Sequence, residues 1–113
     1  MRWAPHSDVR SDTRKDWKVW KPLFQIALDR FCERTLQGAA KYANGEGTPH
    51  ERYLNLYQYL KRKDKELADV FDYFSRSKAL MQVALAAKRK LITPEELATF
   101  SEETQEAIAL MLS

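Results

Sequence analysis

Residues 50–92 contain neither glycine nor proline, and this continuity restricts the fold more than any other feature of the sequence. One unbroken helix over residues 49–90 would be about 63 Å long, at about 1.5 Å per residue. A compact chain of 113 residues has a radius of gyration of only about 13 Å. The helix must therefore break, or it must lie beside a second chain.

Within this stretch, apolar residues recur in alternating steps of four and three, which is typical of a helix that buries one stripe. This frame, in which positions 64, 78 and 88 are polar exceptions, consists of Tyr53, Tyr57, Leu60, Asp64, Leu67, Phe71, Phe74, Lys78, Met81, Leu85, Lys88 and Ile92. Two break points are open, one at Ser75 to Ser77, where serines can cap, and one at residues 61–64. We favour the first, because the second contains good helix formers and is followed by an Arg62–Glu66 pair at helical spacing.

Few residues are suited to strands and turns, because the chain holds only 3 glycines and 4 prolines and is dominated by helix formers. Its length suits one domain. The sequence therefore predicts an all-α fold, a small bundle of about four to five helices in a single domain over 22–113, preceded by an irregular N-terminal arm over 1–21. The expected helices are about 22–44, 49–74, 77–90, 94–99 and 102–112.

Two helix starts are marked by the same four-residue pattern, at 48–51 (TPHE) and at 93–96 (TPEE). In each, a threonine N-cap is followed by proline at the first helical position and by glutamate at the third, which is the capping-box arrangement. Ser101 is the expected N-cap of the last helix. These starts depend only on local chemistry.

The first predicted helix begins at Pro22, since proline suits a first helical position. Apolar residues, among them Phe31 and Leu36, follow a buried stripe along it, and Gly45 is expected to close it in the left-handed conformation. Gly38 lies inside this helix and predicts the close approach of another helix.

The arm of residues 1–21 shows no helical period and contains Pro5 among polar residues. It also contains all three tryptophans, at positions 3, 17 and 20. Because each indole can bury on the order of 200 Å², we expect Trp17 and Trp20 to dock on the body or on a partner chain.

Charge is unevenly distributed, although the net charge is only +3. Residues 1–21 carry six basic and three acidic side chains, 52–90 carry ten basic and four acidic, and 91–113 carry five acidic and none basic. This separation predicts that the basic middle packs against the acidic end, within one chain or between two. The modest total argues against a phosphate-binding surface.

Known catalytic and metal-binding patterns do not fit the sequence. His50-Glu51 begins like a zinc-protease motif, but Leu54 stands where the second histidine is needed, and the other histidine is His6. Cys32 has no second cysteine and is interpreted as a small core residue. We therefore expect no enzyme activity, no cofactor and no metal.

The sequence also predicts a cytoplasmic protein. Its beginning lacks the apolar region of a secretory signal, and a single cysteine suits a reducing compartment. The apolar run 79–87 is less than half of the roughly 20 residues that a membrane-spanning helix needs. No membrane association is expected.

The favoured functional hypothesis is a small non-catalytic protein-interaction protein that self-associates as a homodimer, with another, unidentified protein as a further partner. Tyr59 and Tyr73 fall off the main aromatic stripe, which is otherwise assigned to the core. Exposed aromatic residues are enriched at interfaces. With the docking tryptophans Trp17 and Trp20, they form the predicted interface.

The alternative hypothesis is a nucleic-acid-associated protein. Residues 92–112 have the outline of a helix-turn-helix, and the arm could hold phosphates through basic residues while its tryptophans stack on bases. The arm residues assigned to this contact are Arg10, Arg14, Lys15 and Lys18. However, the reading helix would begin with Glu102 and Glu103 and has no basic residue, so it would be repelled by phosphates. We therefore interpret 92–112 as a structural ending of the bundle.

A second alternative is a magnesium-dependent helical phosphohydrolase, because carboxylates recur at helical spacing in two places. The two groups are Glu66, Asp69 and Asp72, and Glu102, Glu103 and Glu106. The first group lies among lysines and arginines, which favours a salt-bridged solvent face over a metal site.

Overall fold

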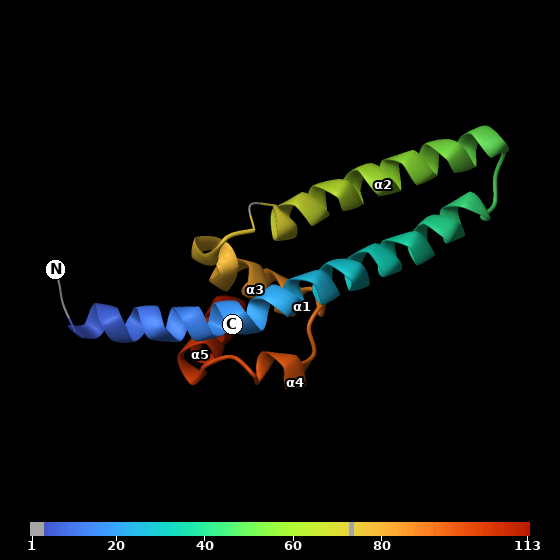
Figure 1. Ribbon diagram of the computed structural model, residues 1–113. Helices are drawn as coiled ribbons and strands as arrows, with labels where there is room; N and C mark the ends of the chain where they lie inside the picture. The colour runs from blue at the N-terminus through green and yellow to red at the C-terminus, as the bar shows by residue number, and fades with distance from the viewer. Residues whose placement is uncertain (1–3, 73) are drawn as a thin grey trace.

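The computed structural model describes the backbone of residues 4–72 and 74–113, and the side chains of 15–72, 74–75 and 77–113. The described residues form helices and connecting turns, which confirms the all-α fold (Figure 1). The elements in chain order are α1 (Ala4–Ala43), α2 (Pro49–Phe71), a short 3-10 helix η1 (Arg76–Lys78), α3 (Ala79–Lys88), α4 (Pro94–Leu97) and α5 (Glu102–Leu112).

The molecule is elongated, with extents of 65 × 28 × 26 Å and a radius of gyration of 18.0 Å. A compact chain of this size would have a radius of about 13 Å. The length follows α1, whose 40 residues span about 60 Å. In Figure 1, α2 runs back beside the C-terminal half of α1, while α3 to α5 gather around its middle.

The prediction of an irregular arm over residues 1–21 is wrong for the described part of that stretch, because α1 already begins at Ala4 and includes Pro22 in its interior. A proline inside a helix costs about 3 kcal/mol. Burial of the neighbouring side chains offsets that cost: Trp20 and Leu23 lie in the core on either side of Pro22. Local propensity placed the helix start at the proline, whereas tertiary packing continues the helix through it.

Trp20 is fully buried and joins α1 to α3. Its indole N–H donates to Gln82 Oε1 at 3.3 Å, and the Gln82 amide donates in turn to the carbonyl of Asp72 at 3.1 Å. Gln82 is the buried polar side chain of the core, and this chain of two hydrogen bonds supplies its partners. The hydrogen bond to Gln82 therefore fixes the orientation of the indole, in addition to its burial in the core.

The core lies where the middle of α1 meets the end of α2, α3 and α5. Its buried members are Trp20, Leu23, Ala27, Phe31, Val70, Phe71, Val83, Ala84, Ala86, Leu91, Ile92, Phe100 and Ile108. Phe24 adds edge contacts to Trp20 at 5.8 Å and to Phe71 at 5.4 Å between ring centroids. This region is the only one in the described chain where more than two helices converge.

Helix α2 breaks where the sequence predicts, but three residues earlier than the expected end at position 74. Its last residue is Phe71, and Asp72 already has extended backbone with ψ 150°. After the break, Phe74 returns to α1 and packs on Phe24 with ring centroids 4.1 Å apart. The Gln82 hydrogen bond satisfies the carbonyl that the break leaves unpaired at Asp72.

All three predicted helix caps are present. Thr48 and Thr93 each accept a hydrogen bond from the glutamate N–H three residues later, and each glutamate side chain accepts from the threonine N–H. Ser101 accepts from the N–H of Thr104. The helices that these caps begin end close to expectation, α4 at Leu97 and α5 at Leu112.

The turn between α1 and α2 differs from the prediction at one glycine. Gly47, with φ 110°, adopts the left-handed backbone that we assigned to Gly45. α1 ends at Ala43, and the turn occupies the residues that follow, so the positive φ falls where the chain reverses directly into the Thr48 cap.

Two arginines of α1 hold the C-terminal end of α3. Arg34 donates to the carbonyls of Arg89 and Lys90, at 3.1 and 2.6 Å, and Arg30 donates to that of Leu91 at 2.9 Å. Lys90 is left-handed with φ 57°, and the Leu91 N–H donates to the Ala86 carbonyl at 2.8 Å, as in a Schellman ending. The arginines satisfy carbonyls that this ending exposes.

Arg30 also forms the main ion pair of the fold. Its guanidinium donates to both carboxylate oxygens of Glu96, at 2.7 and 3.0 Å, while Glu96 completes the Thr93 cap. The hydrogen bond from Arg30 is the largest cause that lowers the pKa of Glu96 from 4.5 to about 2. The acidic C-terminal segment packs through α5 on α3, within the basic middle as predicted, whereas Glu96 pairs with Arg30 of α1.

Gly38 confirms the predicted close approach of a second helix. A Cβ built on Gly38 would lie 2.0 Å from Tyr59 Oη and 2.6 Å from its Cζ. The Tyr59 ring also packs on Tyr42, with centroids 4.8 Å apart. The α1–α2 spacing is therefore set at this point by the lack of a side chain on Gly38.

We predict that Gly38→Ala destabilises the protein by about 1–3 kcal/mol, because the added methyl overlaps the Tyr59 ring. In an open helix position, the same change would stabilise by up to about 1 kcal/mol. Urea unfolding followed by circular dichroism measures the difference. Gln37→Ala, at the exposed neighbouring position, is the matched control; a Gly38→Ala protein as stable as the control would contradict the prediction.

Glu96→Gln should remove a pH-dependent part of the stability. Since the folded pKa of Glu96 is lowered from 4.5 to about 2, its contribution is fully present above pH 4.5 and is lost as the pH falls from there toward 2. Glutamine keeps the cap but not the charge, so we expect a loss of about 1–2 kcal/mol at neutral pH and a flatter stability profile below pH 5.

Denaturant unfolding at a series of pH values tests this, with the exposed Glu95→Gln as the control that removes a carboxylate from the same turn. A Glu96→Gln profile parallel to that of the wild type would show that the Arg30 pair does not depend on the charge of Glu96.

Candidate protein-interaction surface

The candidate site lies on the helical hairpin formed by α2 and the C-terminal half of α1. Unlike the core region, this part of the described chain has only two helices, and their outer sides are not covered by α3, α4 or α5 (Figure 1). Any apolar side chain that does not fit between the two helices is therefore left at the surface.

Helix α2 carries two neighbouring stripes that share the same four-and-three spacing. The stripe that faces α1 consists of Arg52, Leu56, Tyr59, Lys63, Glu66 and Val70, which are buried or half-buried. The adjacent stripe, one residue further along, is the frame that begins with Tyr53, Tyr57 and Leu60. One residue corresponds to a rotation of about 100° around the helix. The packing of α2 therefore selects between stripes of nearly equal periodicity.

The frame stripe remains exposed in the first half of α2. Tyr53, Tyr57 and Leu60 have 64%, 52% and 41% of their surface exposed. Their predicted assignment to the core is wrong, and the frame becomes half-buried or buried only at Leu67 and Phe71. The reason is geometric, because α3 and α5 cover the end of α2 but not its beginning.

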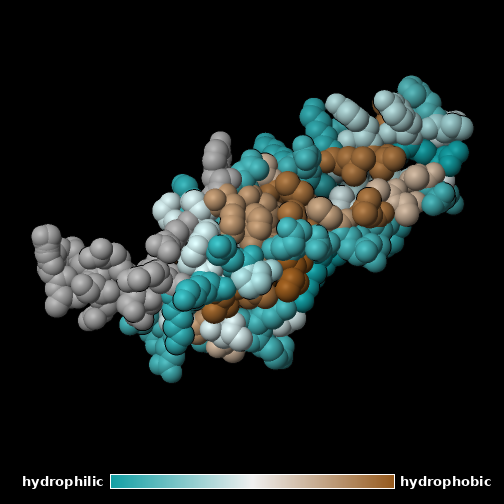
Figure 2. All heavy atoms as spheres, viewed as in Figure 1, coloured by the Kyte–Doolittle hydropathy of each residue, from teal (hydrophilic) through white to brown (hydrophobic). Residues whose placement is uncertain are grey.

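Leu36 of α1 lies beside this stripe and is also 64% exposed. The sequence placed it in the buried stripe of its helix, which holds at Phe31 but not one turn beyond. We use the name hairpin face for the exposed apolar set Leu36, Tyr53, Tyr57 and Leu60. Figure 2 shows hydrophobic residues gathered along the hairpin, with hydrophilic residues on both sides.

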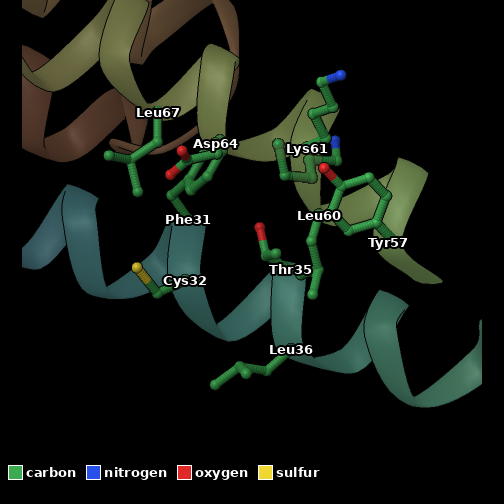
Figure 3. Close-up of a pocket in the computed structure, with 10 residues that line it drawn as sticks. Phe31, Cys32, Thr35, Leu36, Tyr57, Leu60, Lys61, Asp64 and Leu67 are labelled. Atoms are coloured by element: carbon green, nitrogen blue, oxygen red, sulfur yellow. The ribbon is translucent and has the colours of Figure 1, made fainter. Parts of the chain in front are cut away.

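The hairpin face borders a groove of about 520 Å³ between α1 and α2. In Figure 3, Leu60 points from α2 toward α1, Thr35 points back from α1, and the Lys61 ammonium points away. The lining residues are Phe31, Cys32, Thr35, Leu36, Tyr57, Leu60, Lys61, Lys63, Asp64 and Leu67.

The residues that line the groove suit the binding of apolar side chains rather than catalysis. Cys32 is half-buried at one wall, and the lining contains no histidine that could act as its base. Asp64 and Lys61 border the groove as exposed charges of opposite sign, one turn apart on α2. An apolar floor with a charged border is the usual composition of a protein-binding surface.

The two tryptophans predicted at the interface both pack within the chain. Trp20 is in the core, and half-buried Trp17 stacks on Phe74 with ring centroids 4.8 Å apart. Docking on the body is thus confirmed for both. These intrachain contacts bury Trp20 completely and Trp17 in part.

Tyr59 is buried against Gly38, so the prediction that it is partly exposed is wrong. Its ring is further covered by Lys63, whose ammonium lies 5.8 Å from the ring centroid. Tyr73 lies outside the described residues. Trp20 lies about 27 Å along α1 from Gly38, the residue that Tyr59 contacts, given the 18 residues between them and the helical rise. The described members of the predicted interface therefore do not form one surface.

Of the basic residues assigned to nucleic acid, Lys15 and Lys18 are exposed on α1. The side chains of Arg10 and Arg14 lie outside those that the structure describes. The helix-turn-helix outline of 92–112 does not provide an open reading helix. Asp16 of α1 accepts hydrogen bonds from the N–H and the hydroxyl of Ser101, at 2.9 and 3.0 Å, and from the Thr104 hydroxyl, so it occupies the N-terminus of α5.

The carboxylates considered for a metal do not gather. Glu66 pairs with Arg89 at 2.8 Å and with Lys63 at 3.4 Å. Among the side chains that the structure describes, those of 15–72, 74–75 and 77–113, no group of three or more histidine, cysteine, aspartate or glutamate residues is placed to hold a metal ion. In the same residues, no helix combines the length and apolar character that crossing a membrane requires.

Comparison with protein-family models, curated proteins and solved structures gives no match to this chain. The site therefore has to be interpreted from its own geometry. Sequence reasoning missed the hairpin face because it treated the most apolar stripe as buried. The signal for it is that α2 has two stripes that carry apolar residues, whereas the hairpin offers only one other helix, α1, to cover them.

Proposed function

We propose that the chain is a small non-catalytic interaction protein that forms a homodimer through the hairpin face. One observation carries this proposal: of the two stripes on α2, the more apolar one is left exposed along the hairpin, while the stripe against α1 contains Arg52, Lys63 and Glu66. A chain that folded only for itself would bury the more apolar stripe.

The exposed area is of the size that interfaces use. The four side chains of the hairpin face together expose on the order of 400 Å², within the range of apolar patches that serve binding. A standard interface buries about 800 Å² on each partner. The polar border of the groove, including Thr35, Lys61 and Asp64, supplies the remainder.

The shape also favours a second copy of the same chain. Two helices form half of a four-helix bundle, and a second hairpin placed face to face completes it. A two-fold axis presents the same face on both sides, which suits an apolar centre flanked by residues of both signs, here Lys61, Lys63 and Asp64. We further propose a cytoplasmic location, where the Cys32 thiol would stay reduced.

The double substitution Tyr57→Glu and Leu60→Glu tests the dimer. We expect the wild type to sediment as a dimer in the tens of micromolar and the variant as a monomer. Two charges placed at the centre of the face should raise Kd by at least about 100-fold. Because both positions are exposed, circular dichroism should show unchanged helix content.

Leu110→Glu is the matched control, since Leu110 is still more exposed, at 77%, but lies on α5 away from the hairpin. It should leave the dimer intact. A wild-type protein that sediments as a monomer at these concentrations would contradict the proposal, as would a Leu110→Glu variant that dissociates while the hairpin variant stays dimeric.

A further inference from the structure

The distribution of apolar and charged residues along α2 determines how two hairpins can meet, and this inference rests on the proposed homodimer. On α2, the exposed apolar part of the frame spans Tyr53 to Leu60, and the next frame position is the exposed carboxylate of Asp64. Beyond it, Leu67 and Phe71 are increasingly covered within the chain. Contact between copies must therefore be centred near Tyr57 and Leu60.

A parallel arrangement of the two α2 helices is disfavoured by Asp64. Around a two-fold axis parallel to the helices, each frame residue faces its own counterpart. Asp64 would then lie against the partner's Asp64, and like charges in direct contact at an interface are costly. A parallel arrangement would also bring the two α3–α5 regions to the same end.

An antiparallel arrangement removes this conflict. When the two-fold axis crosses α2 between Tyr57 and Leu60, the same spacing that places Tyr57 opposite Leu60 of the partner subunit places Tyr53 opposite the partner's Asp64. A tyrosine hydroxyl can donate to a carboxylate, so the charged frame residue gains a partner. The two α3–α5 regions then lie at opposite ends of the dimer.

A shift of the axis by half a heptad toward Asp64 would give a different pairing. Tyr53 would then have to reach the partner's Phe71, which is 6% exposed and already packed on Phe24 and Phe31 of its own chain. The shifted axis would also bring Lys61 against the partner's Lys61. Both effects favour the first position of the axis.

We propose that two copies of this chain associate antiparallel through α2, with Tyr57 of each packed on Leu60 of the partner subunit and Tyr53 of each donating to Asp64 of the partner subunit. Asp64, the polar position of the exposed frame, then sets the alignment of the two helices, as single polar residues do in coiled coils. The hairpins of the two copies form a four-helix bundle.

Disulfide trapping tests the arrangement. In a Cys32→Ala background, which removes the native thiol, the double variant Tyr53→Cys and Asp64→Cys should form a covalent dimer under mild oxidation, whereas each single variant should not. An intrachain bond is excluded, because the two positions lie about 16 Å apart on one helix and a disulfide needs Cα atoms within about 7 Å.

The outcomes separate the arrangement from the proposed function. Covalent dimers of the single variants would show a parallel contact and overturn the inference, although the homodimer would stand. A dimeric Cys32→Ala protein whose double variant does not cross-link would show a different alignment and also overturn it. If the Cys32→Ala protein and the wild type are both monomeric, the proposed function itself fails.

Charge substitution at Tyr53 gives a second test that does not depend on oxidation. In the antiparallel arrangement, Tyr53→Lys places a positive charge opposite Asp64 of the partner subunit, whereas Tyr53→Asp places a like charge there. The lysine variant should therefore dimerise at least about tenfold more tightly than the aspartate variant. Combining Tyr53→Asp with Asp64→Lys should restore the affinity. Equal weakening by lysine and aspartate would contradict the pairing.

Discussion

The continuity of α1 through Pro22 is the constraint on which the rest of the structure depends. One helix of 40 residues is about 60 Å long. The rest of the chain has fewer than twice as many residues with which to cover it. The burial of Trp20 and Leu23 around the proline keeps the helix intact. The helices α2, α3 and α5 pack along the length of α1.

The coverage of α1 is uneven as a result. Its middle is enclosed by the end of α2, α3 and α5, and Arg30 and Arg34 fasten the turn after α3 to it by direct hydrogen bonds. Beyond Arg34, only α2 remains to cover α1. The close contact between Gly38 and Tyr59 holds this hairpin together, and the hairpin face is the surface that it cannot bury.

The sequence predicted the features that depend on neighbouring residues. The caps at Thr48, Thr93 and Ser101 follow from side chains three residues apart, and Gly38 indicated a close approach because a missing side chain has few other uses inside a helix. The caps and the close approach need no knowledge of the tertiary arrangement. The break after α2 lies beside the predicted position at Ser75 to Ser77, but the length limit of a compact chain does not explain it, because α1 is itself about 60 Å long.

Other features could not be predicted locally. Pro22 was placed at a helix start because proline favours that position locally. The packing that keeps the helix continuous through Pro22 comes from α3, far along the chain. Tyr53 and Tyr57 were assigned to the core because periodicity identifies a stripe but not the element that covers it. Asp16 binds the N-terminus of α5 across 85 residues of sequence, with no local signal.

Small-angle X-ray scattering over a concentration series tests the central claim, that the hairpin face joins two copies of this chain. We expect the scattering mass to rise to twice the chain mass of 13.2 kDa and the radius of gyration to rise above the 18.0 Å of one chain. A mass of 13.2 kDa with an unchanged radius at every concentration would contradict it.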